Sequence, residues 1–175
     1  MVIWITGLSG AGKTTICDAV RARLDNRLPH LVILDGDAIR DVFGNALGFK
    51  EKDRVVQINR LQRLAKMLSD QGLVVLVAAL YSHPDLLAWN RANLNGYFEV
   101  YLDASIEDVR ARDPKGLYGK AAAGQMLDVV GIDIDWRPPS SPDLVLDTSG
   151  REPVDVSVER LIRAVPILSQ HVQEQ

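Results

Sequence analysis

The sequence predicts an α/β fold in which five parallel strands form a sheet flanked by helices. Short apolar runs alternate with helical patterns along the chain. This alternation is typical of parallel sheets, because each crossover between neighbouring strands usually carries a helix. A glycine-rich loop joins the first apolar run to the first helical pattern. Both observations indicate a layered α/β architecture.

The five expected strands are short runs of strand-forming residues. They cover residues 2–6, 31–34, 73–77, 97–102 and 144–146. The runs that begin at Leu31, Leu73 and Leu144 are apolar throughout. We therefore expect these three strands to be covered on both faces.

The expected helices fill the intervals between the strands. They run over 14–24, 55–68 and 84–94, another follows Ser105, and the last begins at Pro153 and is interrupted at Pro166. Apolar residues recur at helical spacing between 55 and 68. Ser105 is a suitable N-cap, with Asp108 three positions later. Proline suits a first helical turn but interrupts a helix interior.

The stretch 113–142 differs from the rest of the chain. It holds four glycines and four prolines and shows no strong period. A segment of this length inside a compact domain is more often a functional lid than a passive connector. Its basic and aromatic residues also argue against a disordered excursion. We expect one domain over residues 1–175, with a lid at about 113–142.

Bulk properties exclude several classes of protein. The net charge of −3 gives no basic surface for nucleic acid. Cys17 is the only cysteine, so no intrachain disulfide forms and a reducing cytoplasm is the simplest location. The run Leu73–Leu80 is too short to span a membrane, and the first strand leaves no room for a signal peptide. We expect a cytoplasmic protein with neither nucleic acid nor membrane as a partner.

The loop Gly7–Thr14 reads G-L-S-G-A-G-K-T, which has the P-loop spacing. Backbone N–H groups of such a loop converge on phosphate oxygens at a helix N-terminus. Lys13 can reach the terminal phosphates, and the Thr14 hydroxyl can ligate Mg²⁺. The predicted nucleotide-binding set is Gly7, Ser9, Gly10, Ala11, Gly12, Lys13, Thr14 and Thr15.

Two aspartates follow the second strand in the string Asp35-Gly36-Asp37. A carboxylate at Asp37 could accept a proton from an acceptor hydroxyl or hold a Mg²⁺-bound water. It could also cap the following helix, and the two roles are compatible. Asp35 is the better candidate for a purely structural role.

Three further residues are candidates for holding the acceptor. The guanidinium forks of Arg40 and Arg54 suit phosphate or sulfate oxygens. Phe49 could stack on a base, and on the sequence alone it could equally be a core aromatic. The two arginines therefore predict an anionic acceptor.

Several strings appear together in order. They are Leu34-Asp35-Gly36-Asp37, Leu47-Gly48-Phe49, Asp53-Arg54, Arg112-Asp113-Pro114-Lys115-Gly116-Leu117-Tyr118, Lys120-Ala121, Gly131-Ile132-Asp133 and 142–148. With the P-loop, this set resembles adenylylsulfate (APS) kinases over residues 2 to about 148. The resemblance implies a P-loop nucleoside-kinase-like fold and the use of ATP and Mg²⁺. It also implies transfer of the γ-phosphoryl of ATP to the ribose 3′-hydroxyl of a nucleotide.

The resemblance assigns roles to particular residues. It implies Asp37 at the reacting hydroxyl and at Mg²⁺, and it places Arg112 and the lid over ATP. Around the acceptor it implies Arg40, Phe49, Arg54 and Lys115. Members of the family are commonly dimers, so a homodimer is also implied.

Departures from the family pattern gather at the acceptor side. Gln57 stands where the family usually has asparagine, Tyr81 lies in a string that is usually Ile-Ser-Pro, and Val129 replaces a phenylalanine that would stack on adenine. Two acceptors therefore stay open, either APS or another nucleotide such as cytidine diphosphoramidate in surface-polysaccharide modification. A regulatory P-loop switch is disfavoured, because the sequence has no Asn-Lys-x-Asp string.

Overall fold

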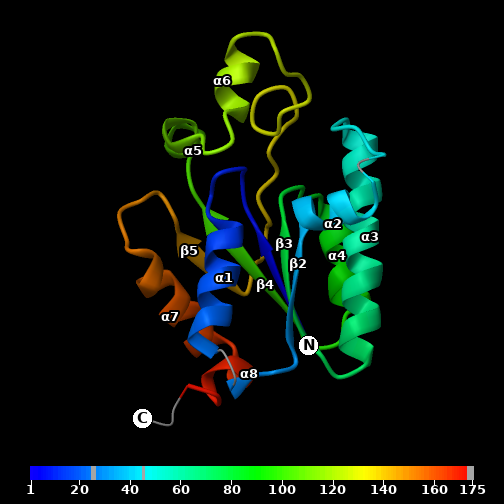
Figure 1. Ribbon diagram of the computed structural model, residues 1–175, viewed down its shortest axis with the longest axis vertical. Coiled ribbons are helices and arrows are strands. Elements are labelled where there is room, and N and C mark those ends of the chain that lie inside the picture. The colour runs from blue at the N-terminus through cyan, green and yellow to red at the C-terminus, as the bar shows by residue number, and fades with distance from the viewer. Residues whose placement is uncertain (25–26, 45, 173–175) are drawn as a thin grey trace.

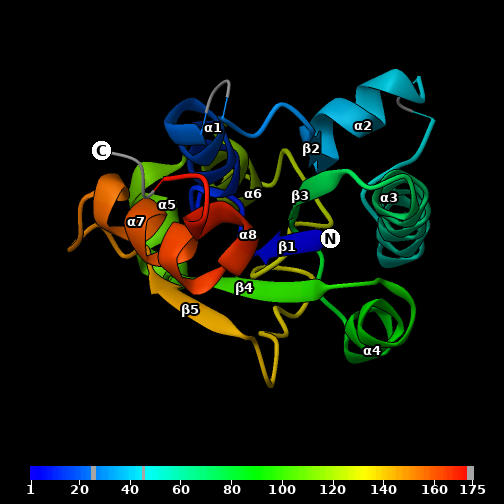
Figure 2. The same cartoon turned by 90° about the horizontal axis from the view of Figure 1, so that it is seen from below.

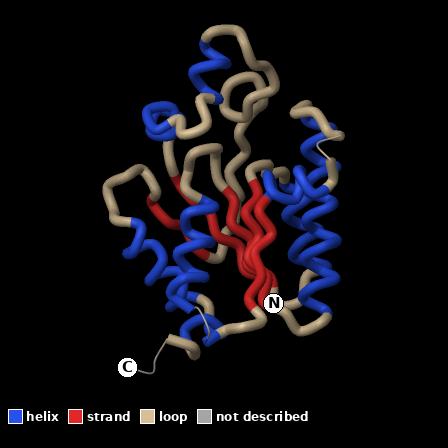
Figure 3. Tube along the Cα trace, viewed as in Figure 1, coloured by secondary structure: helices blue, strands red, loops and turns tan. Residues whose placement is uncertain are grey.

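The computed structural model describes residues 1–24, 27–44 and 46–172. All five expected strands are present, and they form one parallel sheet in the order β2-β3-β1-β4-β5. The strands are β1 (Val2–Thr6), β2 (Leu31–Asp35), β3 (Val74–Ala79), β4 (Tyr97–Asp103) and β5 (Leu144–Asp147). The predicted α/β class is confirmed (Figures 1 and 3).

Helices cover both faces of the sheet. They are α1 (Lys13–Leu24), α2 (Gly36–Val42), α3 (Glu51–Asp70), α4 (Pro84–Asn93), α5 (Ile106–Arg112), α6 (Leu117–Ala122), α7 (Val154–Ala164) and α8 (Pro166–Ser169). Figure 2 shows α1, α7 and α8 on one face and α3 and α4 on the other. In the described part of the chain, no helix is both long and apolar enough to cross a membrane.

The three apolar runs are not equally buried, contrary to the sequence expectation. Strand β3 is buried at every position. Strands β2 and β5 are the two edges of the sheet, and most of their residues are only partly covered. Val145 of β5 remains 44% exposed. An apolar run indicates that a strand contacts a core. The position of the strand in the sheet, central or edge, decides how completely the strand is buried.

The parallel register brings three loops to one rim of the sheet. Thr6, which ends β1, pairs with Ala79 at the end of β3, and Asp35 of β2 pairs with Ala78. The P-loop, the start of α2 and the segment after Ala79 therefore leave the sheet at the same edge. Ligands of open α/β sheets bind at this carboxyl edge.

The predicted N-cap at Ser105 is confirmed, whereas the possible N-cap at Asp37 is wrong. Ser105 caps α5 in a full capping box, since its side chain accepts from the Asp108 N–H while the Asp108 carboxylate accepts from the Ser105 N–H. Helix α2 is capped by Asp35, not by Asp37. It begins two residues earlier than a cap at Asp37 would require, so Asp35 occupies the extended N-cap position and Asp37 lies within the first turn.

The segment 113–142 lies over the carboxyl edge of the sheet (Figure 1). It contains α6, a helix of six residues that is too short to show a period in the sequence. Tyr118 of α6 is buried, and its hydroxyl donates to the carbonyl of Ser9 at 3.1 Å. The Asp113 carboxylate accepts from the N–H groups of Tyr118 and Gly119. The segment is thus docked on the P-loop.

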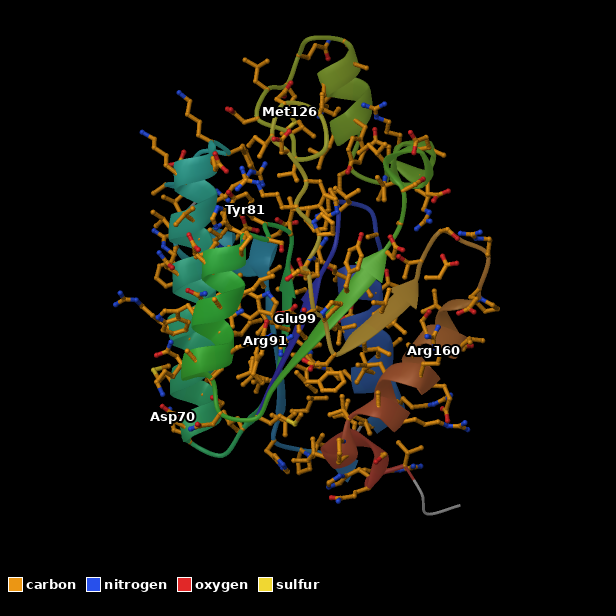
Figure 4. All side chains as sticks on the ribbon, turned by 180° about the vertical axis from the view of Figure 1, so that it is seen from behind. Asp70, Tyr81, Arg91, Glu99, Met126 and Arg160 are labelled. Atoms are coloured by element: carbon orange, nitrogen blue, oxygen red, sulfur yellow. The ribbon has the colours of Figure 1, made fainter. Side chains whose placement is uncertain are left out.

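A polar network lies at the C-terminal end of the segment 113–142. Arg91 of α4 and the buried Glu99 of β4 point toward one another (Figure 4), with a nitrogen–oxygen distance of 3.5 Å. Asp143 accepts from the Glu99 N–H at 2.7 Å and lies 3.3 Å from Arg91. Tyr97 donates to the Glu99 carboxylate. Burial raises the pKa of Glu99, the contacts with Tyr97 and Arg91 oppose that shift, and the charge of Asp143 adds to it.

Candidate active site

A cavity of about 730 Å³ extends along the carboxyl edge of the sheet. Its walls come from the P-loop, α2, α3, the end of β3, the segment 113–142 and the chain after β5. The predicted site residues that line it are Ser9, Gly10, Ala11, Gly12, Lys13, Thr14, Thr15, Asp37, Arg40, Phe49, Arg54, Gln57, Tyr81, Arg112, Lys115 and Val129. The residues predicted for the donor and for the acceptor thus share one cavity of a size common for ligand sites.

Gly7 is the predicted site residue that does not line the cavity. A Cβ atom at this position would lie 2.9 Å from the carbonyl oxygen of Leu102. Glycine is therefore needed here for close packing of the loop on β4. Gly10 and Gly12 do line the cavity, with φ angles of +78° and +97° that favour glycine.

Lys13 is folded onto its own loop. Its ammonium donates to the carbonyl oxygens of Gly7 at 2.7 Å and Leu8 at 2.8 Å. Burial, followed by repulsion from Lys115, lowers the pKa of Lys13 to about 8. The charged form still predominates at neutral pH. The ammonium is partly desolvated, and the two carbonyl oxygens offer it only partial negative charge. A phosphate group would offer it a full negative charge.

Thr14 and Asp35 meet at the mouth of the loop. The Thr14 hydroxyl donates to Oδ2 of Asp35 at 2.7 Å. Oδ1 of Asp35 accepts from the N–H groups of Asp37 and Ala38. One carboxylate thus caps α2 and contacts the hydroxyl expected at a metal ion. Sequence reasoning ranked Asp35 as structural and missed its contact with Thr14, although its position directly after β2 was the available signal.

Asp37 faces the segment 113–142 across the cavity. Its Oδ2 atom accepts a hydrogen bond from the ammonium of Lys115, a residue 78 positions further along the chain. Both side chains are more than half exposed. The ion pair thus places Lys115 of the segment 113–142 beside Asp37, the carboxylate that the sequence suggests as the proton acceptor.

Phe49 is surrounded by cations and is not a core aromatic. Its ring is 44% exposed. The guanidinium carbons of Arg40 and Arg54 lie 4.9 Å and 5.8 Å from the ring centroid. Arg40 also donates to the carbonyls of Leu47 and Gly48. A planar base beside this ring would have two cations close to it.

The three departures from the family pattern are buried residues that line this cavity. The Gln57 amide donates to the carbonyl of Gly36 at 2.9 Å. The Tyr81 hydroxyl donates to Glu51, and burial together with this bond raises the pKa of Tyr81 to about 12. Val129 is 4% exposed. Figure 4 shows Tyr81 at the end of β3, with Met126 above it.

The donor end of the cavity includes a loop that sequence reasoning missed. Arg112 donates to the carbonyls of Gly10 and Thr148. Residues in 148–154 line the same end. The signal was topological, because this loop leaves the carboxyl end of β5 and therefore emerges on the same rim as the P-loop.

Comparison with known proteins agrees with this geometry. The profile of the family described as adenylylsulphate kinase matches residues 1–147. The chain belongs to this family. It is 44% identical to the adenylyl-sulfate kinase of Pseudomonas entomophila over 84% of this chain and 72% of the relative. It is also 34% identical to the cytidine diphosphoramidate kinase of Campylobacter jejuni, over 95% of this chain and 96% of the relative.

A solved structure shares the fold over nearly the whole chain. This is the APS kinase of Mycobacterium tuberculosis in complex with AMPPNP and APS, with a TM-score of 0.85 and 34% identity. The match covers 94% of this chain and 96% of that one. The expectation of a P-loop kinase of the APS kinase family is confirmed, and the protein is a phosphotransferase.

Proposed function

We propose that the protein transfers the γ-phosphoryl group of ATP to the ribose 3′-hydroxyl of a nucleotide, with APS as the first candidate acceptor. The observation that carries this proposal is the shared cavity, which Asp37 lines together with the P-loop and the cations around Phe49. The Mycobacterium tuberculosis relative binds an ATP analogue together with APS. Such an arrangement suits direct transfer between two bound nucleotides.

On the donor side, the loop N–H groups and Lys13 would hold the phosphates of ATP. Arg112 and the loop after β5 would border the rest of the donor nucleotide. Mg²⁺ fits the hard oxygen atoms that Thr14 and Asp35 present 2.7 Å apart. When bound, the ion neutralises charge on the phosphate oxygens.

On the acceptor side, Asp37 would take the proton of the 3′-hydroxyl. The hydroxyl oxygen then forms a bond to the γ-phosphorus, and the bond between that phosphorus and the leaving ADP breaks. Lys115 contacts Asp37 in the structure, so the acceptor must share or displace this ion pair. Displaced from Asp37, the ammonium would be free to neutralise charge on a nucleotide bound in the cavity that Lys115 lines.

A turnover screen tests the proposal. The purified protein is incubated with Mg-ATP and either APS, cytidine diphosphoramidate or an unrelated nucleotide. We expect ADP formation that depends on one of the first two and gives a 3′-phosphorylated product. ADP formation without any acceptor dependence would contradict the kinase assignment.

Cytidine diphosphoramidate is a second candidate because of Val129. A buried valine lines the cavity where an aromatic partner for adenine is expected. A branched aliphatic side chain cannot stack on a purine as a ring does. The smaller cytosine ring therefore loses less at this position.

Val129→Phe is expected to raise kcat/KM for APS relative to cytidine nucleotides by about 5-fold or more, because a stacked aromatic contributes roughly 1 kcal/mol of base contact. The measurement is the ratio of kcat/KM for the two acceptors. Val130→Phe, at the neighbouring buried position, is the matched control for crowding. An unchanged ratio together with family-typical turnover of APS by the wild type would mean that Val129 has no part in choosing the base.

We propose that the segment 113–142 is a lid that closes over bound nucleotides. Its polar contacts to the rest of the site join Tyr118 to Ser9, Lys115 to Asp37 and the Asp128 carbonyl to Arg54. ADP, Mg²⁺ and acceptor together should therefore suppress protease cleavage between Asp113 and Pro138, since their phosphates add partners for its cations. Cleavage at the turn after α3 is the internal control. Equal cleavage of the segment with and without ligands would make it a passive loop.

A further inference from the structure

Three buried side-chain atoms on α3 lack a hydrogen-bond partner among the described residues. One of them, Nη1 of Arg60, belongs to a residue that does not line the cavity, and the other two are Nε of Arg54 and Oε1 of Gln57. The two side chains line the cavity, and the residues are 8% and 5% exposed. A buried polar atom without a partner costs free energy, so such atoms in native proteins usually meet a ligand or an ordered water. Two of them on one wall indicate a ligand group of matching chemistry.

The orientation of the Gln57 amide follows from its bond to Gly36. The Gly36 carbonyl can only accept, so the amide NH₂ must face it at 2.9 Å. Rotating the amide by half a turn would place two oxygens against each other. The remaining oxygen, Oε1, is therefore held as an acceptor that requires a donor. Arg54 presents the opposite requirement, because its unpaired Nε–H is a charged donor.

The charged tail of the acceptor nucleotide is the part that suits this pair. Arg54 precedes Gln57 by three positions, so both side chains lie on one face of α3. Burial lowers the pKa of the Arg54 guanidinium, which means that the cation is poorly solvated and would gain from an anion. The base is neutral, and the exposed Phe49 ring offers it a stacking surface nearby. With the base stacked on Phe49, we expect the anionic 5′ tail to lie against Arg54 and Gln57.

We propose that Arg54 and Gln57 together read the terminal group of the acceptor's 5′ tail and select a phosphoramidate over a sulfate. The inference rests on the proposed function, in which the acceptor is a nucleotide. A phosphoramidate has an anionic oxygen for the Arg54 Nε–H and an amino hydrogen for Oε1 of Gln57. A sulfate has only acceptor oxygens, one of which would face Oε1 without a proton between them. The pair favours the second candidate acceptor and assigns the selection to its tail, independently of the base.

The test compares acceptors that differ only in the terminal group. With Mg-ATP at pH 8, kcat/KM is measured for APS against adenosine 5′-diphosphoramidate, and for cytidine 5′-phosphosulfate against cytidine diphosphoramidate. We expect the amidate to be preferred by about 10-fold or more in both series, because the wrong group leaves a buried acceptor unpaired. CDP, whose terminal phosphate carries no proton at this pH, should behave like the sulfate.

Gln57→Met removes Oε1 while keeping the length of the side chain, and it should lower the ratio of amidate to sulfate by about 10-fold. Gln62→Met is the matched control. Gln62 is a buried glutamine of the same helix, and its amide donates to the Leu86 carbonyl and the Asn90 side chain, away from the cavity. This control should leave the ratio unchanged.

The outcomes separate this inference from the proposed function. If no nucleotide is phosphorylated, the proposed function fails. If acceptors with either terminal group are phosphorylated equally well, or the sulfate is preferred, the assignment as a nucleotide kinase stands. The proposed selection of the terminal group by Arg54 and Gln57 is then overturned. An amidate preference that survives Gln57→Met also overturns it. The wild-type ratio decides the matter even if Gln57→Met does not fold.

Discussion

Asp37→Asn is expected to lower kcat by roughly 10² to 10⁴, because the amide keeps the size of the side chain but cannot take the hydroxyl proton. The melting temperature should change little, since Asp35 and not Asp37 caps α2. The Asp37 side chain is 72% exposed and forms an ion pair with Lys115. Steady-state turnover and thermal unfolding of the same preparation check both parts of this prediction.

Asp85→Asn is the control for Asp37→Asn. Asp85 also lies in the first turn of its helix, α4, and it is not among the residues that line the cavity. Its replacement should leave kcat unchanged. Normal turnover per folded molecule of Asp37→Asn, combined with a large loss of stability, would show that Asp37 has only a structural role.

Lys13→Ala is expected to lower kcat by about 10² or more while the fold survives, because its ammonium offsets charge that develops in the transition state. The variant loses two hydrogen bonds to carbonyls of its own loop, at 2.7 Å and 2.8 Å. Those bonds connect residues of one loop, so the sheet does not depend on them. Single-turnover assays at saturating ATP separate this effect from weaker binding.

Lys66→Ala is the matched control for Lys13→Ala. Lys66 pairs with Asp70 at the C-terminal end of α3, and neither residue lines the cavity. Such an exposed pair contributes little to stability, so kcat should remain at the wild-type value. Wild-type turnover by Lys13→Ala with the same acceptor would remove the P-loop lysine from the mechanism.

Local patterns predicted the elements of this fold because the forces that form them act over a few residues. The capping box at Ser105 and Asp108 depends on a three-residue spacing, and the P-loop depends on glycines at fixed places in one turn. The strands were predicted for the same reason. The six-residue helix α6 was missed, since so short a segment has no measurable period.

The convergence of the site was only partly predictable. Parallel strands bring their carboxyl ends to one edge, and this rule alone placed the P-loop and Asp37 together. The contact between Asp37 and Lys115 joins residues 78 positions apart, and it depends on the path of the segment 113–142. The free oxygen of Gln57 depends on the approach of the Gly36 carbonyl, which no local pattern encodes.

The sequence by itself determined the α/β class and the phosphate-binding loop, and it predicted a set of residues that meet in one cavity. The tertiary structure decided that Asp35 caps α2 and contacts Thr14, that β2 and β5 are edge strands, and that Arg54 and Gln57 present unpaired atoms to one cavity. The reason is physical. Residue type and spacing set local conformation, whereas the partner of each buried polar atom is set by strand order and by packing between distant segments.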